Sequence, residues 1–187
     1  KLKRRQYAIK MKVLILEEYY KGNDALQVLV DAVWEGALAA GHEARILEVN
    51  DYTLIPCHGC LMCGFDSPCV LSDDMDDLKE EILKADAVVF ASSPTDRGLS
   101  PQLFALASRF IYFTQELRRK KLRSALISAA PEAALEGFSK LLARYTSLTG
   151  QLALSDRGRL LVPGCRMPED LTGTEYLEKA NALGRGL

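Results

Sequence analysis

The sequence predicts an α/β fold in which helices cover both faces of a parallel sheet. Short, mostly apolar runs alternate along the chain with longer segments whose apolar residues recur at helical spacing. Each of the five runs precedes a helical segment, as in a doubly wound sheet of parallel strands. The chain has 187 residues, 48% of them apolar, which is enough for one sizeable core.

We expect the five strands at the apolar runs 11–16, 44–49, 87–91, 122–129 and 159–162. We expect the helices at 24–40, 73–83, 101–117, 131–148 and 174–183. Asn23 or Asp24 is suited to cap the first helix, and Gly41 is suited to end it. Pro101 fits the first position of the third helix, with Ser100 as its cap.

Composition and charge limit the partners that we expect. The net charge of −1 gives no reason to expect a nucleic acid, and no apolar run approaches the roughly 20 residues of a membrane span. Residues 1–10 are basic and lack the apolar region of a signal peptide, so we set them apart as a native extension or a cloning remnant. Residues 11–187 are then expected to form a single cytoplasmic domain with a cysteine-rich loop at 56–70.

Four of the five cysteines lie within thirteen residues, at Cys57, Cys60, Cys63 and Cys69. The spacing C-x2-C-x2-C-x5-C aims several thiolates at one centre, and three cysteines in seven residues suit three corners of a cubane iron–sulfur cluster. Structural zinc is the second interpretation, because zinc sites usually split their cysteines into two separated pairs. Disulfides and unligated thiols remain open, although disulfides are typical of secreted chains.

The ligand site of a doubly wound sheet lies outside the carboxyl ends of its strands. The loops after the first and third strands are therefore the natural cofactor loops. The cysteine loop follows the second strand, so we expect it to open at the same edge of the sheet.

The cysteine block, followed by Asp73, Asp74 and Met75, resembles the iron–sulfur flavoproteins of the flavodoxin-like, NADPH-dependent FMN reductase superfamily. The resemblance extends over residues 11–187 and includes the closing segment 178–185. It implies the sheet order 2-1-3-4-5, a [4Fe–4S] cluster on the four cysteines, and FMN at the first and third loops. It also implies electron transfer between cluster and flavin, often in a dimer or tetramer.

The resemblance assigns the flavin to seven residues of these two loops, namely Gly22, Asn23, Asp24, Ser92, Ser93, Pro94 and Gly98. Around them the chain departs from the family. Glu17, Glu18, Tyr19 and Tyr20 stand where the family has small residues around the FMN phosphate. A carboxylate about 5 Å from a phosphate charge costs up to about 3 kcal/mol at an effective dielectric near 20.

The simplest interpretation of these departures is that the first loop lies on the surface and has no ligand. We expect Glu17 and Glu18 at a solvated loop tip, and Tyr19 and Tyr20 either packed in the loop or stacked on a planar ligand. In the third loop, Asp96 and Arg97 replace the family's aromatic residues and are expected to form a surface ion pair. Cys165 has no ligand spacing to its neighbours and is expected to be a buried thiol.

Two hypotheses of function follow. In the first, the chain is a redox protein that passes electrons through a [4Fe–4S] cluster, with FMN if the altered loops still bind it. Any enzymatic activity would then be that of an NADPH-dependent FMN reductase, served by a nicotinamide cofactor or a redox partner protein. In the second, it is a flavin-free binding or assembly subunit whose cysteine loop holds a cluster or zinc as a relay or a structural staple. Either form is expected to be a homo-oligomer or a subunit of a complex.

Overall fold

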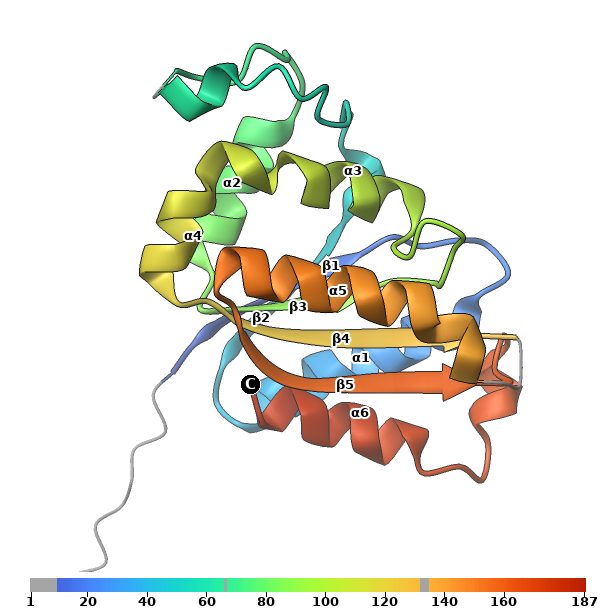
Figure 1. The fold of residues 1–187 in the computed structure, drawn as a ribbon. Helices are drawn as coiled ribbons and strands as arrows, with labels where there is room; N and C mark the ends of the chain where they lie inside the picture. Colours follow the sequence, from blue (N-terminus) through green and yellow to red (C-terminus); the bar gives the residue numbers. More distant parts are fainter. Residues whose placement is uncertain (1–9, 66, 132–134) are drawn as a thin grey trace, which may run out of the picture.

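The computed structural model describes residues 10–65, 67–131 and 135–187 and shows one five-stranded parallel sheet (Figure 1). Its strands lie in the order β2-β1-β3-β4-β5, which confirms the predicted topology. The strands are β1 (Lys12–Glu17), β2 (Glu43–Glu48), β3 (Ala87–Ala91), β4 (Arg123–Ala130) and β5 (Ser155–Pro163). Strand order reverses at β1 and β3, so a cofactor site is expected beyond their carboxyl ends.

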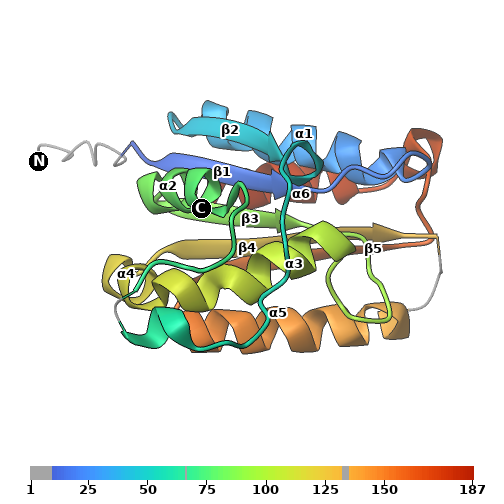
Figure 2. The ribbon, with the colours of Figure 1, turned by 90° about the horizontal axis from the view of Figure 1, so that it is seen from above.

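Helices cover both faces of the sheet. On one face lie α1 (Asp24–Ala39) and α6 (Tyr176–Arg185). On the other lie α2 (Met75–Lys84), α3 (Pro101–Arg109), α4 (Thr114–Lys120) and α5 (Ser139–Leu152), as Figures 1 and 2 show. In the described ranges, no helix is long and apolar enough to cross a membrane.

Alternation along the strands explains the two layers. In β1, Leu14 and Leu16 pack in the core under α2, α3 and α5, whereas Val13 and Ile15 pack in the core under α1 and α6. Successive side chains of a strand point to opposite faces, so a strand buried on both sides must be apolar throughout. The three almost wholly buried runs, in β1, β3 and β4, are accordingly the central strands of the sheet.

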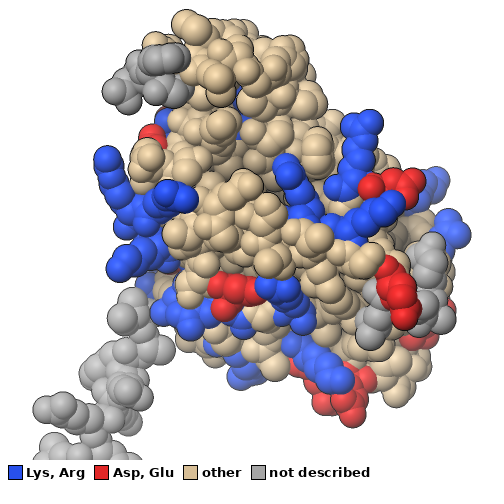
Figure 3. All heavy atoms as spheres, in the orientation of Figure 1, with Lys and Arg blue, Asp and Glu red and all other residues tan. Residues whose placement is uncertain are grey.

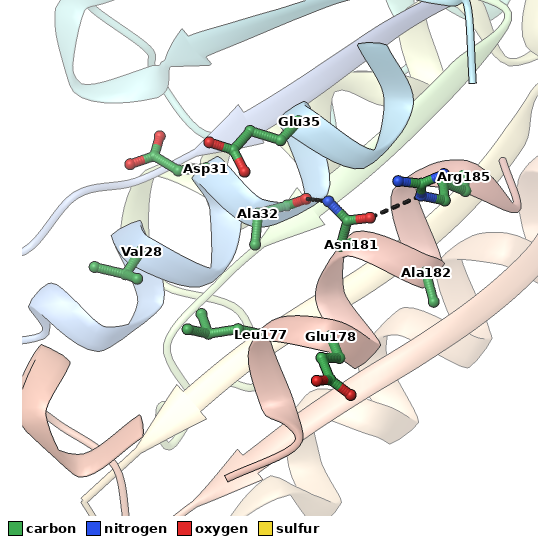
Figure 4. Close-up of a pocket in the computed structure, with 9 residues that line it drawn as sticks. All are labelled: Val28, Asp31, Ala32, Glu35, Leu177, Glu178, Asn181, Ala182 and Arg185. Carbon is green, nitrogen blue, oxygen red and sulfur yellow. Dashed lines mark hydrogen bonds between the residues drawn. The ribbon is translucent and has the colours of Figure 1, made fainter. Parts of the chain in front are cut away.

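Two glycines bring α1 and α6 into backbone contact. A Cβ at Gly36 would collide with the carbonyl of Asn181, and a Cβ at Gly184 would collide with the carbonyl of Val33. The Asn181 side chain donates a hydrogen bond to Ala32 O at 3.4 Å and accepts one from Arg185 Nε at 2.8 Å (Figure 4). A surface groove of about 600 Å³ lies over this contact.

Some helix boundaries differ from the prediction. The helix expected at 101–117 is interrupted by a 3₁₀ turn at Phe110–Phe113, which separates α3 from α4. The helix expected at 131–148 begins only at Ser139 and continues past Gly150 to Leu152, while residues 132–134 lie outside the described residues, as do residues 1–9. At Ala153 the backbone turns left-handed, with φ of 53°, and this ends α5.

The cysteine loop leaves the carboxyl end of β2 and does not stay there. Figure 2 shows the segment running across the outside of α3 before it returns to α2. Its cysteines lie against the C-terminal end of α3 and the following 3₁₀ turn. The loop thus begins at the cofactor edge, as expected, but its cysteines lie away from that edge. The loop is long enough to reach the outer surface of the helical layer.

Candidate functional site

The cysteine loop begins and ends at one point. Thr53 N donates to the Asp74 carboxylate at 2.7 Å, and Asp74 N donates to Thr53 O at 3.1 Å. Ile55 N donates to the Asp73 carboxylate at 2.8 Å. These contacts join the segment that leaves β2 to the segment that returns directly before α2. The loop therefore has a closed base, and the cysteines project beyond it.

All four predicted ligand residues line one small cavity of about 30 Å³, together with Arg109, Ile111 and Tyr112. Cys60 is exposed, and the other three are partly buried. Among the described residues, no three His, Cys, Asp or Glu side chains are gathered closely enough to hold a metal ion. Four soft sulfur donors around one cavity fit an iron–sulfur cluster or zinc by their chemistry.

Two backbone amides of this loop donate hydrogen bonds to side chains, one to a cysteine sulfur and one to a serine hydroxyl. Gly59 N donates to Cys57 Sγ at 3.4 Å, and Cys57 N donates to Ser108 Oγ at 2.9 Å. Gly59 has φ of +70°, a conformation that favours glycine, and this turn directs its amide back at the sulfur. Hydrogen bonds to ligand sulfurs are among the features that set the potential of such clusters.

Arg109 connects the cavity to the base of the loop. Its guanidinium donates to Cys69 Sγ at 3.3 Å, to Ile55 O at 2.8 Å, and to both oxygens of Asp73 at 2.6 and 3.2 Å. Burial alone would raise the pKa of Asp73, but Arg109 and the amides of Ile55 and Met75 bring it below its ordinary value. The carboxylate therefore remains ionised beside the guanidinium.

The rim of this cavity is apolar. Leu61 and Val70 are 64% and 60% exposed, and Met62 and Ile111 are about half exposed. The top of the view in Figure 3, where the loop lies, shows few charged side chains, whereas lysines and arginines gather below it. An uncharged rim keeps the local dielectric low around any charged group held inside it.

At the carboxyl edge of the sheet, the first loop is organised around two buried carboxylates. Glu17 is 5% exposed and Glu18 is 1% exposed, so the prediction of a solvated loop tip is wrong. Burial raises the pKa of Glu17 to about 7, and the carboxylates of Glu48 and Asp31 add to this effect. Glu17 is the last residue of β1 and pairs with Glu48 in β2, which explains their proximity.

Glu18 caps α3. Its Oε2 accepts hydrogen bonds from Gln102 N at 2.9 Å and from Leu103 N at 3.1 Å, whereas Ser100 makes no side-chain cap. The positive end of the helix dipole and two free amides favour an anion at this position. The chain supplies that anion itself. In the described part of the chain, the other oxygen of Glu18 is buried without a hydrogen-bond partner.

The amides of the first loop are also engaged. Asn23 N donates to Tyr20 O, Leu26 N donates to Asn23 O, and Ala25 N donates to Arg166 O. Arg166 Nε donates to Gly22 O at 2.6 Å. Tyr19 OH donates to the Asp24 carboxylate at 2.9 Å within the loop, and Tyr19 and Tyr20 are 37% and 46% exposed. These contacts occupy the positions where an FMN phosphate would be bound at the start of α1.

The third loop is tied to the first. Asn23 Nδ2 donates to Ser93 Oγ at 2.7 Å, and Ser100 N donates to Ser92 Oγ at 2.9 Å. Thr95 and Gly98 exchange two backbone hydrogen bonds, which closes the turn around Asp96 and Arg97. The hydrogen bond between Asn23 and Ser93 thus joins the two predicted flavin loops at the carboxyl edge of the sheet. The predicted Asp96–Arg97 pair is replaced by an ion pair between Asp96 and Lys140 at 3.1 Å.

These loops do not fit an FMN phosphate. Such a group needs free amides and positive charge at a helix start. Here the amides of Asn23, Ala25 and Leu26 are taken, and the α3 terminus holds the carboxylate of Glu18. Arg166 is a nearby cation, but its side chain binds the Gly22 carbonyl. Binding of FMN would require this loop to open.

Three site residues were not singled out from the sequence. Ser108 and Arg109 end α3, and Arg166 follows β5, so each is distant in sequence from the loop that it contacts. The one available signal for Arg109 is a cation within the apolar pattern of a helix. Cys165 is buried as expected, at 3% exposure, and lies apart from the four cysteines of the cavity.

The fold and its two loops define a flavodoxin-like protein. Flavodoxin of Megasphaera elsdenii superposes with a TM-score of 0.58 over 94% of this chain and 99% of its own, at 11% identity. The NAD(P)H:quinone oxidoreductase of Methanothermobacter marburgensis superposes with a TM-score of 0.73 over 94% of this chain and 96% of its own, at 19% identity. At these identities the similarity establishes the fold alone.

The chain belongs to the NADPH-dependent FMN reductase family, whose sequence model matches residues 11–145. It is also similar to an iron-sulfur flavoprotein of Methanocaldococcus jannaschii, with 32% identity over 48% of this chain and 45% of that protein. The iron-sulfur flavoprotein of Methanosarcina thermophila is 33% identical over 49% of this chain and 46% of its own. The match thus spans about half the length of these relatives. The chain is therefore a flavodoxin-like member of this family.

Proposed function

We propose that the chain transfers electrons through a [4Fe–4S] cluster held by Cys57, Cys60, Cys63 and Cys69. The observation that carries this proposal is that all four thiols line one cavity within a loop whose two ends are hydrogen-bonded to each other. The similarity to proteins named iron-sulfur flavoproteins supports it. A cluster of this type supplies one-electron oxidation and reduction.

The surrounding residues would hold such a group and keep water from it. Leu61, Val70 and Ile111 form an apolar rim, and the amide of Gly59 faces the sulfur of Cys57. The side chains of Ser108 and Arg109 fix the beginning and end of the loop. The protein's part in electron transfer would therefore be to position the sulfurs and set their electrostatic surroundings.

FMN is the less well supported cofactor. If it binds, it would border Gly22, Asn23, Asp24, Ser92, Ser93, Pro94 and Gly98, where the family's flavin loops lie. The buried Glu18 and the engaged amides at the start of α1 oppose this. They favour the second candidate, a flavin-free subunit in which the cysteine loop holds a cluster or zinc as a relay or a staple.

The two candidates differ in their electron donor. A reduced nicotinamide delivers two electrons as hydride, and a flavin can release them one at a time to a cluster. With FMN, a nicotinamide cofactor is therefore a suitable donor. Without FMN, the donor would be a partner protein that delivers single electrons. In either case we expect a cytoplasmic protein that works as a homo-oligomer or within a complex.

The test is purification without air, followed by absorbance, iron and acid-labile sulfide analysis. We expect a broad band near the blue end of the visible spectrum and about four irons and four sulfides per chain, as a [4Fe–4S] cluster requires. Zinc in place of iron and sulfide would support the structural-staple alternative. Absence of all three after reconstitution with iron and sulfide would overturn both.

A flavin titration separates the two candidates. FMN added to the metal-loaded protein should leave flavin fluorescence unquenched if the chain is a flavin-free subunit. Stoichiometric quenching, with FMN retained through gel filtration, would establish the flavoprotein instead. Riboflavin, which lacks the phosphate, is the matched ligand for this test, because only FMN carries a negative charge that the carboxylates of the first loop would repel.

A further inference from the structure

Arg109 is almost completely buried, with 1% exposure, although it lies at the end of a helix that borders the surface. A buried guanidinium needs a compensating charge, and Asp73, also 1% exposed, supplies it. This pair joins residues that are 36 positions apart in the sequence. Burying these two charges costs desolvation free energy. We therefore ask which contacts of the pair could explain why it is buried.

Those contacts reach both ends of the cysteine loop. Nη1 donates to Ile55 O, on the segment that leaves β2, and to Asp73, on the segment that returns to α2. Nη2 donates to Asp73 and to Cys69 Sγ, on the side of the cavity. Only a planar group with several fixed NH donors can reach these acceptors together, and lysine cannot replace it.

We propose that Arg109 is the positioning residue of the cysteine loop and supplies the buried positive charge that sets the potential of the group bound there. The part on the potential rests on the proposed function. The part on positioning does not, because the contacts to Ile55 and Asp73 are independent of any metal.

The charges predict opposite effects of the two partners. A cluster bound by four thiolates becomes more negative when it gains an electron, so a nearby positive charge favours the reduced form. Replacing Arg109 by glutamine removes this charge and leaves the Asp73 carboxylate close to the cluster. Replacing Asp73 by asparagine leaves the guanidinium uncompensated. The first change should lower the potential, and the second should raise it.

A purely structural role gives another pattern. If the pair only held the loop in shape, R109Q and D73N would loosen it alike and shift the potential in the same direction. R109K separates charge from geometry, because it keeps the charge and loses the simultaneous contacts to Ile55, Asp73 and Cys69. Its potential should stay near that of the unmodified protein, while the loop becomes less protected.

The positioning role is tested on the metal-free protein by amide hydrogen exchange. We expect R109Q and R109K to lose protection by tenfold or more at Ile55, Cys57 and Met75, with unchanged exchange in α6. R118Q is the matched control, because Arg118 is an exposed arginine of α4 that contacts only the carbonyl of Gln151 in the described structure. Unchanged exchange in R109Q and R109K would overturn the positioning role.

The potential is measured on the loaded protein by spectroelectrochemical titration, with the electron paramagnetic resonance spectrum of the reduced state as a second readout. Opposite shifts in R109Q and D73N, with none in R118Q, support the proposal. Shifts of the same sign, or none, would overturn it. If R109Q does not fold, a raised potential in D73N together with an unchanged potential in R109K supports the proposal, and equal shifts in these two variants overturn it. If the unmodified protein binds no cluster, the proposed function fails, and hydrogen exchange still decides the positioning role.

Discussion

Glu17 and Glu18 are neighbours in the chain, and their carboxylates serve different elements. The carboxylate of Glu17 lies at the end of β1 among other carboxylates, and that of Glu18 lies at the start of α3 on two amides. The sequence shows both only as charged residues after an apolar run, which is typical of a surface turn. The burial of Glu18 depends on contacts with residues 84 and 85 positions further along the chain. No local pattern could have indicated it.

Glu17 should make stability fall as the pH rises. Its pKa in the fold is about 7, above the ordinary value of 4.5, so the folded protein binds this proton more tightly than the unfolded chain does. The resulting stabilisation is complete below pH 4.5, declines as the pH rises toward 7, and is absent above that. E17Q stays neutral and removes this loss, which amounts to at most about 3 kcal/mol. Urea unfolding at pH 5 and pH 8 measures it, and an equal effect of E17Q at both pH values would contradict the assignment.

Glu18 should oppose flavin binding through its charge. E18Q keeps an oxygen for the amides of Gln102 and Leu103 and removes the negative charge, so α3 keeps its cap. We expect FMN affinity to rise by up to about 3 kcal/mol, with little change for riboflavin. Fluorescence titration with both ligands measures this. An equal gain for riboflavin would show that loop shape, and not charge, limits binding.

At the scale of elements, α3 connects the two sites. Its first turn is capped by Glu18 at the carboxyl edge of the sheet, and its last residue is Arg109 at the cysteine loop. A nine-residue helix is about 13 Å long, so this distance separates the flavin loops from the cavity within one chain. Its start at Pro101 was predictable from Ser100 and Pro101. Its end was not, because the apolar pattern continues through the 3₁₀ turn into α4.

The contact between α1 and α6 should be sensitive to a single methyl group. G184A places a Cβ against the carbonyl of Val33, which is backbone and can give way only if a helix moves. We expect a loss of about 1–3 kcal/mol. G150A is the matched control, because Gly150 lies in α5 with no atom close to the added Cβ. It should stabilise the protein by about 0.5–1 kcal/mol. Chemical unfolding of both variants tests the pair, and a neutral G184A would show that the helices separate easily.

At the scale of the whole molecule, the doubly wound parallel class followed from the alternation of strands and helices, and the strand order followed from the resemblance to the family. A strand that is buried on both faces is a continuous apolar run, and such a run can be recognised in the sequence without knowledge of distant contacts. The site was only partly predictable. The clustering of the four cysteines was visible from spacing, but their place on the outer face of α3 depends on Ser108 and Arg109, which spacing does not reveal.

Metal loading should stabilise the whole domain. A group that binds only the folded state adds about 2.7 kcal/mol at a hundredfold excess over its dissociation constant, or roughly 5–10 °C in Tm for a chain of this size. C63S should lose most of this gain and most of the iron. C165S should keep both, because Cys165 is buried away from the cavity. Calorimetry with and without a chelator measures the shift, and equal iron content in the two variants would exclude Cys63 as a ligand.

The touching ends of the cysteine loop make it a separable insert. Thr53 and Asp74 are hydrogen-bonded to each other, so the chain returns to the point from which it left. Replacing residues 56–72 by a short glycine-containing turn should leave the domain folded, with cooperative urea unfolding and no bound iron. Loss of cooperative unfolding would show that the loop is part of the core. The cysteine loop is then a module that a flavodoxin-like domain can gain, lose or exchange without rebuilding its sheet.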